Sequence, residues 1–167
     1  HRDLHSFPTR RSSDLGTGVL LNNEMDDFAA DLQGSNAYGL SGSQANSIAP
    51  GKRPLSSMSP SFIESRDTFA SFGTPGGSRI PSMVLLAMLE YLQQQPLQRW
   101  TDRPRFHHQF RPDVIEHEPD AFTPTEQAAL QARGHVLKTT GRAYGNQQVL
   151  LWNKTDNQVQ AASDRRG

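Results

Sequence analysis

Two short stretches of the sequence carry groups that could bind a carboxylate or a developing oxyanion. Ser56 and Ser57 are adjacent hydroxyl residues within the proline-stiffened segment 52–60. Gly76 and Gly77 directly precede an apolar helical run, so their backbone N–H groups would be unhindered near a helix N-terminus. Hydroxyls and free N–H groups with little bulk around them suit a carboxylate or oxyanion site. A glycine pair before a helix is also typical of a plain tight turn, so the residues alone leave both interpretations open.

An acidic cluster lies further toward the N-terminus. Glu24, Asp26 and Asp27 place three carboxylates close together in the sequence. A calcium-binding loop would need ligands at alternate positions, a glycine and a distal glutamate, and the cluster lacks this pattern. A solvated acidic turn is the plainest interpretation of these residues taken alone.

A pair of histidines invites a metal-site interpretation. His107 and His108 are adjacent, and His117 and Glu118 follow shortly after them. Neighbouring residues on any regular element point in different directions, so adjacent histidines rarely bind one ion together. The chain also has no cysteine, which excludes disulfides and thiolate metal sites. We therefore expect no metal, and histidines that are buried in the core or at an interface.

Composition limits the possible classes of protein. The chain has 167 residues, enough for one domain, and its 34% of apolar residues predict a modest core. Lysine plus arginine and aspartate plus glutamate both number 17, so no basic field indicates a nucleic-acid partner. No run of about 18 apolar residues is present, which argues against membrane insertion.

The glycine pair must be positioned by the elements that precede it. The β-prone runs Ser61–Glu64 and Thr68–Phe72 are separated by a three-residue polar turn, which predicts a hairpin. The hairpin ends at Gly73, so the glycine pair is delivered to the end of a strand. The segment 29–52 is rich in glycine, serine and asparagine, which indicates an extended loop.

A helix is predicted directly after the glycine pair, over residues 80–94. Its apolar side chains recur at helical spacing, Pro81 suits the first turn, and Pro96 prevents further extension. Additional leucines widen the apolar stripe, so we expect this helix to be buried on most sides. Further predicted elements are a strand at 19–21, a helix that starts with the capping box Thr123–Glu126 and ends at Gly134, and strands at 135–137, 149–152 and 159–161.

Four of these stretches resemble, in order and spacing, the small subunit of γ-glutamyltranspeptidases. They are Asn22-Asn-Glu-Met-Asp-Asp-Phe28, Lys52-Arg-Pro-Leu-Ser-Ser-Met-Ser-Pro60, Pro75-Gly-Gly-Ser-Arg79 and Pro104-Arg-Phe-His-His-Gln109. The resemblance covers residue 16 to about residue 165. The C-terminal segment 161–167 resembles the family's Gly-Ala-Ser-Asp-Pro-Arg ending, but it has Ala161 in place of the glycine and lacks the proline.

The resemblance implies a fold and a role for each site residue. The fold is α+β, part of the αββα sandwich of N-terminal-nucleophile hydrolases, in which two antiparallel sheets stack between helical layers. Glu24 and Asp27 take the positions that hold the α-amino group of the γ-glutamyl donor. The remaining roles are binding of the donor carboxylate by Ser56 and Ser57, and binding of the oxyanion by the N–H groups of Gly76 and Gly77.

The resemblance also implies an activity and partners. The reaction is acyl transfer from glutathione or other γ-glutamyl compounds to amino acids, peptides or water, with no cofactor and no metal. In the family, the nucleophile is a threonine at the start of the small subunit, exposed by self-cleavage of a precursor that also supplies the large subunit. That threonine would lie upstream of Gly16, so we expect the chain alone to be inactive. A periplasmic or secreted location is implied.

Two other functions stay open beside this one. A related acylase of the same superfamily, acting on poly-γ-glutamate or on a cephalosporin side chain, would keep the Ser-Ser and Gly-Gly features. A non-catalytic amino-acid-binding module would keep the binding residues without turnover.

The first fifteen residues stand apart from the rest of the chain. They have neither helical nor strand periodicity, and they lack the apolar centre and cleavage site of a signal peptide. They resemble the translation of a sequencing adapter. We therefore expect residues 1–15 to be non-native and disordered, and residues 16–167 to be the γ-glutamyltranspeptidase small-subunit fragment.

Overall fold

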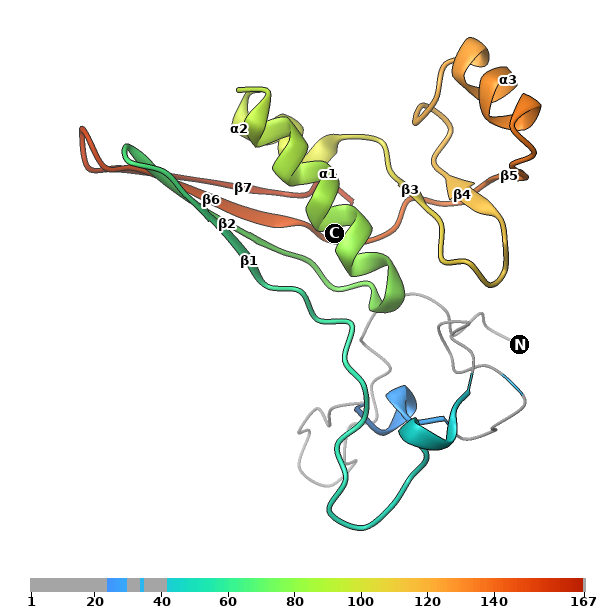
Figure 1. Ribbon diagram of the computed structural model, residues 1–167. Helices are drawn as coiled ribbons and strands as arrows, with labels where there is room; N and C mark the ends of the chain where they lie inside the picture. The colour runs from blue at the N-terminus through green and yellow to red at the C-terminus, as the bar shows by residue number, and fades with distance from the viewer. Residues whose placement is uncertain (1–23, 30–33, 35–41, 167) are drawn as a thin grey trace, which may run out of the picture. The chain divides into compact units, whose positions relative to one another are not determined.

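The structure is a computed structural model that describes residues 24–29, 34 and 42–166 (Figure 1). The chain divides into two compact units, residues 1–56 and residues 57–167. The segment 1–15 and the predicted strand at 19–21 lie outside the described residues, so both interpretations stay predictions.

The described part of the first unit is built from two short 3-10 helices, η1 (Glu24–Asp27) and η2 (Gln44–Asn46). A parallel bridge joins Ala29 to Ser47, and the Ala29 N–H donates to the Asn46 carbonyl at 2.9 Å. Phe28 and Ala29 are buried. The chain that follows η1 is thus paired with the chain that follows η2.

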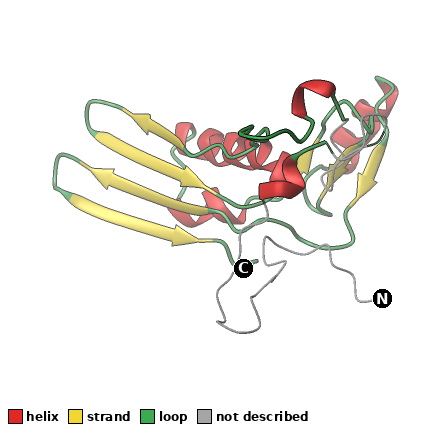
Figure 2. Ribbon diagram, turned by 90° about the horizontal axis from the view of Figure 1, so that it is seen from below, coloured by secondary structure: helices red, strands yellow, loops and turns green. Residues whose placement is uncertain are grey.

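An antiparallel sheet forms the larger part of the second unit. Its four strands lie in the order β1-β2-β6-β7, side by side in Figure 2. Their bounds are β1 Ser61–Glu64, β2 Thr68–Gly73, β6 Gln148–Asn153 and β7 Gln158–Ser163. The predicted hairpin is confirmed, with Ser61 opposite Phe72 and Glu64 opposite Phe69. The two predicted C-terminal strands are confirmed as β6 and β7.

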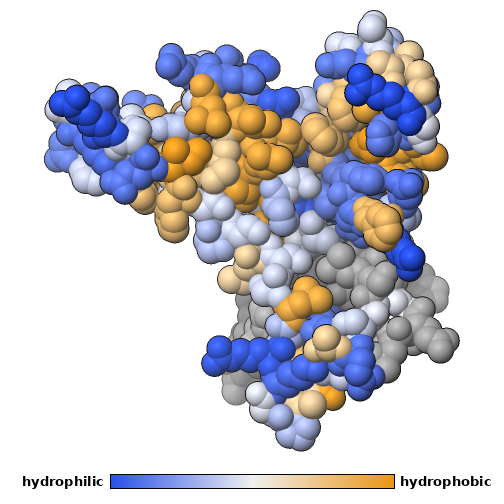
Figure 3. Space-filling view, in the orientation of Figure 1, coloured by the Kyte–Doolittle hydropathy of each residue, from blue (hydrophilic) through white to orange (hydrophobic). Residues whose placement is uncertain are grey.

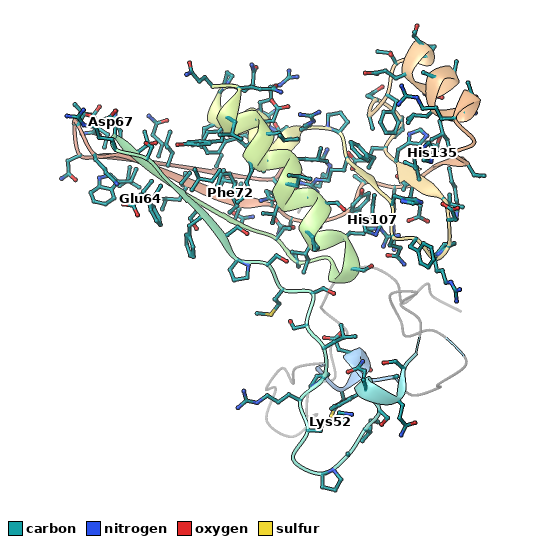
Figure 4. All side chains as sticks on the ribbon, viewed as in Figure 1. Lys52, Glu64, Asp67, Phe72, His107 and His135 are labelled. Carbon is teal, nitrogen blue, oxygen red and sulfur yellow. The ribbon has the colours of Figure 1, made fainter. Side chains whose placement is uncertain are left out.

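Two helices cover one face of this sheet, α1 (Ile80–Leu92) and α2 (Leu97–Asp102). Phe72 points from β2 toward the helices (Figure 4) and lies 5.8 Å, between ring centroids, from the stacked ring of Trp100. Tyr91 meets Trp100 edge-to-face at 5.3 Å. Such aromatic pairs add to the free energy gained from burial. The buried core residues that surround them are Ala70, Ile80, Met83, Val84, Ala87 and Val149.

The expectation that the first helix is buried on most sides is wrong. Leu85 and Leu92 are 55% and 64% exposed, and apolar atoms gather over α1 in Figure 3. The face of α1 that carries Met83 and Ala87 is buried, whereas the side that carries Leu85 and Leu92 is left exposed by the described residues. The helix also ends at Leu92, and Pro96 is the N-cap of α2, a helix that was not predicted.

A smaller sheet is formed by β3 (Phe106–His107), β4 (Ile115–His117) and β5 (Leu137–Thr139). Strand β4 pairs antiparallel with β3 and parallel with β5. Helix α3 (Pro124–Ala132) lies between β4 and β5 along the chain. The strand predicted at 135–137 is found two residues later, as β5.

The predicted capping box at the start of α3 is confirmed. The Glu126 N–H donates to the Thr123 hydroxyl at 3.3 Å, and the Thr123 N–H donates to the Glu126 carboxylate at 2.7 Å. These hydrogen bonds lower the pKa of Glu126, the backbone one most. Both donors are groups that the helix itself leaves unpaired. Gly134, with φ +91°, follows the helix as expected.

A buried network of four charges ties the C-terminal segment to the rest of the second unit. Arg105 pairs with Asp164, and Arg166 donates to Glu118 at 2.8 Å and to Asp164 at 3.1 Å. The Arg105 N–H also donates to Glu118 at 2.8 Å. Two cations therefore face two anions, and the segment that resembles the family ending is integrated into the fold.

The network keeps the Asp164 carboxylate ionised. Burial alone would raise the pKa of Asp164, but the N–H groups of Gln147 and Arg166 and the guanidinium of Arg105 outweigh it and hold the pKa below its ordinary value. The contribution of Asp164 to stability is therefore present at neutral pH and is lost as the pH falls through this lowered pKa.

We predict that Arg105→Met lowers the free energy of unfolding of the protein by about 3–5 kcal/mol, because it strands a buried carboxylate. The matched control is Lys154→Met, which removes a pair with the exposed Glu64 and should cost about 0–1 kcal/mol. Denaturant unfolding measures both values. Equal losses for the two variants would contradict the importance of the network.

Candidate functional site

The glycine pair forms a turn between a strand and a helix, as predicted. Strand β2 ends at Gly73, and the 3-10 helix η3 (Gly77–Arg79) leads directly into α1. Gly76 has φ +150° and Gly77 has φ +57°, and side-chain-bearing residues rarely adopt such values. A Cβ atom on Gly76 would lie 2.5 Å from Met83 Cε. The turn therefore requires glycine for its backbone conformation and for its close approach to α1.

The N–H groups of the glycine pair are available for a ligand. Within residues 24–29, 34 and 42–166, no hydrogen bond uses the N–H of Gly76 or Gly77. Both residues are half-buried. Two unpaired donors just before a helix are suited to stabilising a negatively charged oxygen.

One side of the turn is connected to the loop before β6. The Thr74 hydroxyl accepts a hydrogen bond from the Asn146 N–H at 3.2 Å and donates to the Pro75 carbonyl at 2.9 Å. Gly145 is buried at φ +84°, and a Cβ atom there would collide with Met83 and Arg105. The loop can approach the turn this closely because residue 145 has no side chain.

The other side of the turn is connected to β3 through side chains. The Ser78 hydroxyl donates to Gln109 Oε1 at 2.8 Å, and His107 Nε2 lies 2.8 Å from the same oxygen. His107 Nδ1 lies 2.8 Å from the hydroxyl of Ser82, in the first turn of α1. We assign the proton of His107 to Nε2, because an amide oxygen can only accept. Figure 4 labels His107 beside α1.

His107 is held in its neutral form by these surroundings. Burial lowers its pKa, and the nearby Arg79 lowers it further. Protonation of Nδ1 would remove the acceptor for the Ser82 hydroxyl. The hydrogen-bonded row from Ser78 to Ser82 thus depends on an uncharged imidazole.

Ionisable groups next to the turn are paired or neutral. Arg79 pairs with Glu116 and lies over the ring of Tyr144, 5.3 Å from its centroid. Burial would raise the pKa of Glu116, but Arg79 and Lys138 outweigh it and keep the carboxylate ionised. Burial raises the pKa of Tyr144 to about 12. Neither group is therefore poised to exchange a proton near neutral pH.

The predicted ammonium-binding residues, Glu24 and Asp27, share η1 in the first unit. Asp27 is half-buried, whereas its neighbour Asp26 is exposed. The Asp27 carbonyl accepts a hydrogen bond from Asn46 Nδ2 at 2.7 Å. Asp27 is thus less exposed than Asp26.

Asn46 also reaches the serine segment. Its Oδ1 accepts from the Leu55 N–H at 2.9 Å, directly before Ser56. One side chain therefore links the acidic helix to the predicted carboxylate-binding segment. Ser56 is exposed and closes the first unit, whereas Ser57 is half-buried and begins the second. The predicted site residues are thus divided between two units: Glu24, Asp27 and Ser56 in one, and Ser57, Gly76 and Gly77 in the other.

The histidines have separate partners. His108 lies 2.8 Å from Asp113, away from the partners of His107, and His117 Nδ1 lies 2.8 Å from the Glu118 carbonyl. The expectation of buried histidines is confirmed for His107 and His117, whereas His108 is exposed. Among the described residues, no three histidine, aspartate or glutamate side chains are grouped to hold a metal ion.

Sequence reasoning missed three supporting residues, Asn46, Thr74 and Gln109. Each of them has at least one hydrogen-bond partner that lies between 9 and 72 positions away in the chain. Spacing within one element cannot reveal such pairs. Thr74 and Gln109 do stand at the edges of the glycine and histidine stretches, and this was the only available signal.

The sequence is similar to proteins of one known family. The sequence matches the profile of the gamma-glutamyltranspeptidase family over residues 11–167. It is 40% identical over 152 residues to the glutathione hydrolase proenzyme of Escherichia coli strain K12, which covers 90% of this chain and 26% of that protein. It is 47% identical over 121 residues to the glutathione hydrolase proenzyme of Pseudomonas sp. strain A14, which covers 71% of this chain and 21% of that protein. The chain thus spans roughly a quarter of the length of these relatives.

Solved structures agree with the fold. A mutant of the Helicobacter pylori gamma-glutamyltranspeptidase superposes with a TM-score of 0.86 at 33% identity, covering 98% of this chain and 89% of that chain. An acivicin-inhibited gamma-glutamyltranspeptidase gives a TM-score of 0.85 at 34% identity, covering 93% and 84%. The described helices include none long and apolar enough to span a membrane.

The lowered pKa of His107 predicts a pH-dependent stability. The unfolded chain binds a proton near pH 6.5 but the folded one only at lower pH, so stability is lost as the pH falls through this window. We expect the thermal midpoint of the protein to decrease as the pH is lowered from about 7.5 to about 5.5. His107→Gln should reduce this fall, whereas substitution of the exposed His135 should not. If the thermal midpoint of His107→Gln depended on pH as it does in wild type, His107 would not be the source of the pH dependence.

Proposed function

This chain belongs to the gamma-glutamyltranspeptidase family, and we propose that it supplies the donor-binding and oxyanion-stabilising residues of a γ-glutamyltransferase or glutathione hydrolase. Its fold is the α+β fold of the solved family members, which are N-terminal-nucleophile hydrolases. The described residues form a four-stranded antiparallel sheet covered by α1 and α2, and a three-stranded sheet with helix α3. The substrates are glutathione or other γ-glutamyl compounds, and the acceptors are amino acids, peptides or water.

The observation that carries this proposal is the pair of N–H groups at Gly76 and Gly77, which have no hydrogen-bond partner among the described residues. When a nucleophile attacks the γ-carbonyl carbon, its double bond to oxygen opens and the oxygen becomes an oxyanion. Two N–H donors fixed in advance stabilise this charge in the transition state more than they stabilise the neutral carbonyl. The glycine turn is half-buried, so water screens this interaction only partly.

The donor's amino-acid end requires acceptors and donors of its own. In the proposal, Glu24 and Asp27 accept hydrogen bonds from the α-ammonium, and Ser56 and Ser57 donate to the α-carboxylate. A hydrogen bond with both partners charged is shorter and stronger than a neutral one. The half-buried position of Asp27 and its connection through Asn46 to the serine segment support these roles.

The reaction then has two acyl-transfer steps. A threonine hydroxyl, supplied by the remainder of the enzyme, attacks the γ-carbonyl and its proton passes to the leaving amine. The γ-glutamyl ester that forms is attacked by water or an acceptor amine, which releases the threonine. In both steps the Gly76 and Gly77 N–H groups hold the oxyanion, and this chain's other residues keep the donor in place.

The partner in this proposal is the remainder of the same precursor, including a large subunit. Apolar side chains on the sheet face opposite α1 support such a partner. Phe62 is 61% exposed and stacks on Phe69 at 5.5 Å, and Trp152 and Val159 are also exposed. Exposed apolar surface of this kind is typical of an interface. A periplasmic or secreted location is part of the same proposal.

We predict that the complete enzyme releases the amine from a γ-glutamyl anilide, and that Asp27→Ala lowers kcat/KM at least about thirty-fold. This corresponds to about 2 kcal/mol, the lower end of the loss when a buried charged partner is removed. Asp26→Ala is the matched control and should stay within about threefold of wild type, because exposed substitutions cost little.

A donor that lacks the α-amino group makes the test specific. Wild type should process it poorly, whereas Asp27→Ala should barely distinguish it from the normal donor, because one contact cannot be lost twice. If the mutant still discriminates as strongly as wild type, Asp27 does not bind the ammonium. A complete protein that folds but binds γ-glutamyl compounds without turnover would favour the non-catalytic module.

A further inference from the structure

We propose that Thr74 and Gln109 are positioning residues that hold the Gly76–Gly77 turn from its two ends, so that both N–H groups keep one direction. The catalytic meaning of this clamp rests on the proposed function. Its structural meaning does not, because every contact in it lies within the second unit.

Thr74 fixes the end of the turn that leaves β2. Its hydroxyl accepts from the Asn146 N–H at 3.2 Å and donates to the Pro75 carbonyl at 2.9 Å. Asn146 itself belongs to a loop that is held by Arg105, whose guanidinium donates to the Tyr144 carbonyl. The start of the turn is therefore connected to the buried charge network rather than to the sheet alone.

Gln109 fixes the end of the turn that enters α1. Its Oε1 lies 2.8 Å from the Ser78 hydroxyl and 2.8 Å from His107 Nε2, and its Nε2 donates to the Arg111 carbonyl at 3.1 Å. With both ends of the amide engaged, the side chain has one orientation. Ser78 directly follows the glycine pair, so this contact restrains the second glycine.

The turn needs such restraints because of its own sequence. Two adjacent glycines have more accessible backbone conformations than any other pair of residues. Oxyanion stabilisation depends on donors that are oriented before the reaction begins. The Met83 side chain lies close to Gly76 and Gly145, but an apolar contact does not fix the direction of an N–H group. The polar contacts at both ends can do so.

The test uses Thr74→Val, which keeps the side-chain shape but removes the hydroxyl, and Gln109→Met, which removes the amide. Removing an oxyanion donor costs roughly 100- to 1,000-fold in kcat, so misdirecting one should lower kcat at least about tenfold, with KM within about threefold. Thr74→Ser should retain wild-type kcat within about threefold, because it keeps the hydroxyl. The matched control is Thr68→Val at the opposite end of β2, which removes a hydroxyl hydrogen-bonded to Tyr91 at 2.7 Å.

Hydrogen exchange, followed by mass spectrometry on the complete protein, gives a second measurement that does not need turnover. The backbone amides of the segment 74–79 should exchange faster in Thr74→Val and in Gln109→Met than in wild type. In Thr68→Val their exchange rate should be unchanged. The clamp is refuted if exchange in this segment stays at the wild-type rate, or if Thr68→Val lowers kcat as much as Thr74→Val. A wild-type protein without amine release, together with faster exchange in both clamp variants, would support the clamp and reject the proposed activity.

Discussion

The buried pairing of Arg105 with Asp164 is the interaction on which most of the second unit depends. Asp164 lies near the end of the chain, and Arg105 lies between α2 and β3. Taking two charges out of water costs several kcal/mol for each ion, and their attraction offsets this only with good geometry and further hydrogen bonds. Here Arg166, Glu118 and the Gln147 N–H supply those bonds. The network adds little net free energy, but the loss of one partner would leave a buried charge uncompensated.

The same network reaches the candidate site through the loop before β6. Arg105 and Asp164 hold the main chain of this loop at Tyr144 and Gln147. Between these points, the Asn146 N–H donates to Thr74. Three contacts thus lead from the C-terminal segment to the glycine turn. The sheet provides the strand that ends at this turn, and the charge network provides the loop that supports it.

Much of the fold could be predicted from local patterns. The hairpin, the glycine turn, the start of α1 and the Thr123–Glu126 capping box all follow from neighbouring residues, and the structure confirms each one. Helix α2 was missed because Pro96 was interpreted as a stop, whereas proline also suits a helix start. Strands β3 and β4 are two and three residues long, too short for alternation to show. The outer face of α1 was misjudged, since sequence alone does not show which layers of the fold are present.

The candidate site also has parts that the sequence indicated and parts that only the structure shows. Residue types and family resemblance indicated the acidic, serine and glycine stretches. The supports of these stretches are long-range hydrogen bonds from Asn46, Thr74 and Gln109, and only the folded structure brings them together. The roles of the charged residues at Arg105 and Asp164 were equally hidden, because a buried ion pair leaves no periodic signal in sequence.

The central claim is that the Gly76–Gly77 turn stabilises the oxyanion of γ-glutamyl transfer. A crystal structure of the complete enzyme with a phosphonate analogue of the tetrahedral intermediate tests it most directly. The account predicts that one phosphonate oxygen lies about 2.7–3.1 Å from both Gly76 N and Gly77 N, with Thr74 and Gln109 in their present contacts. A phosphonate bound to the enzyme's nucleophile with its oxygens directed away from both glycines would contradict the claim.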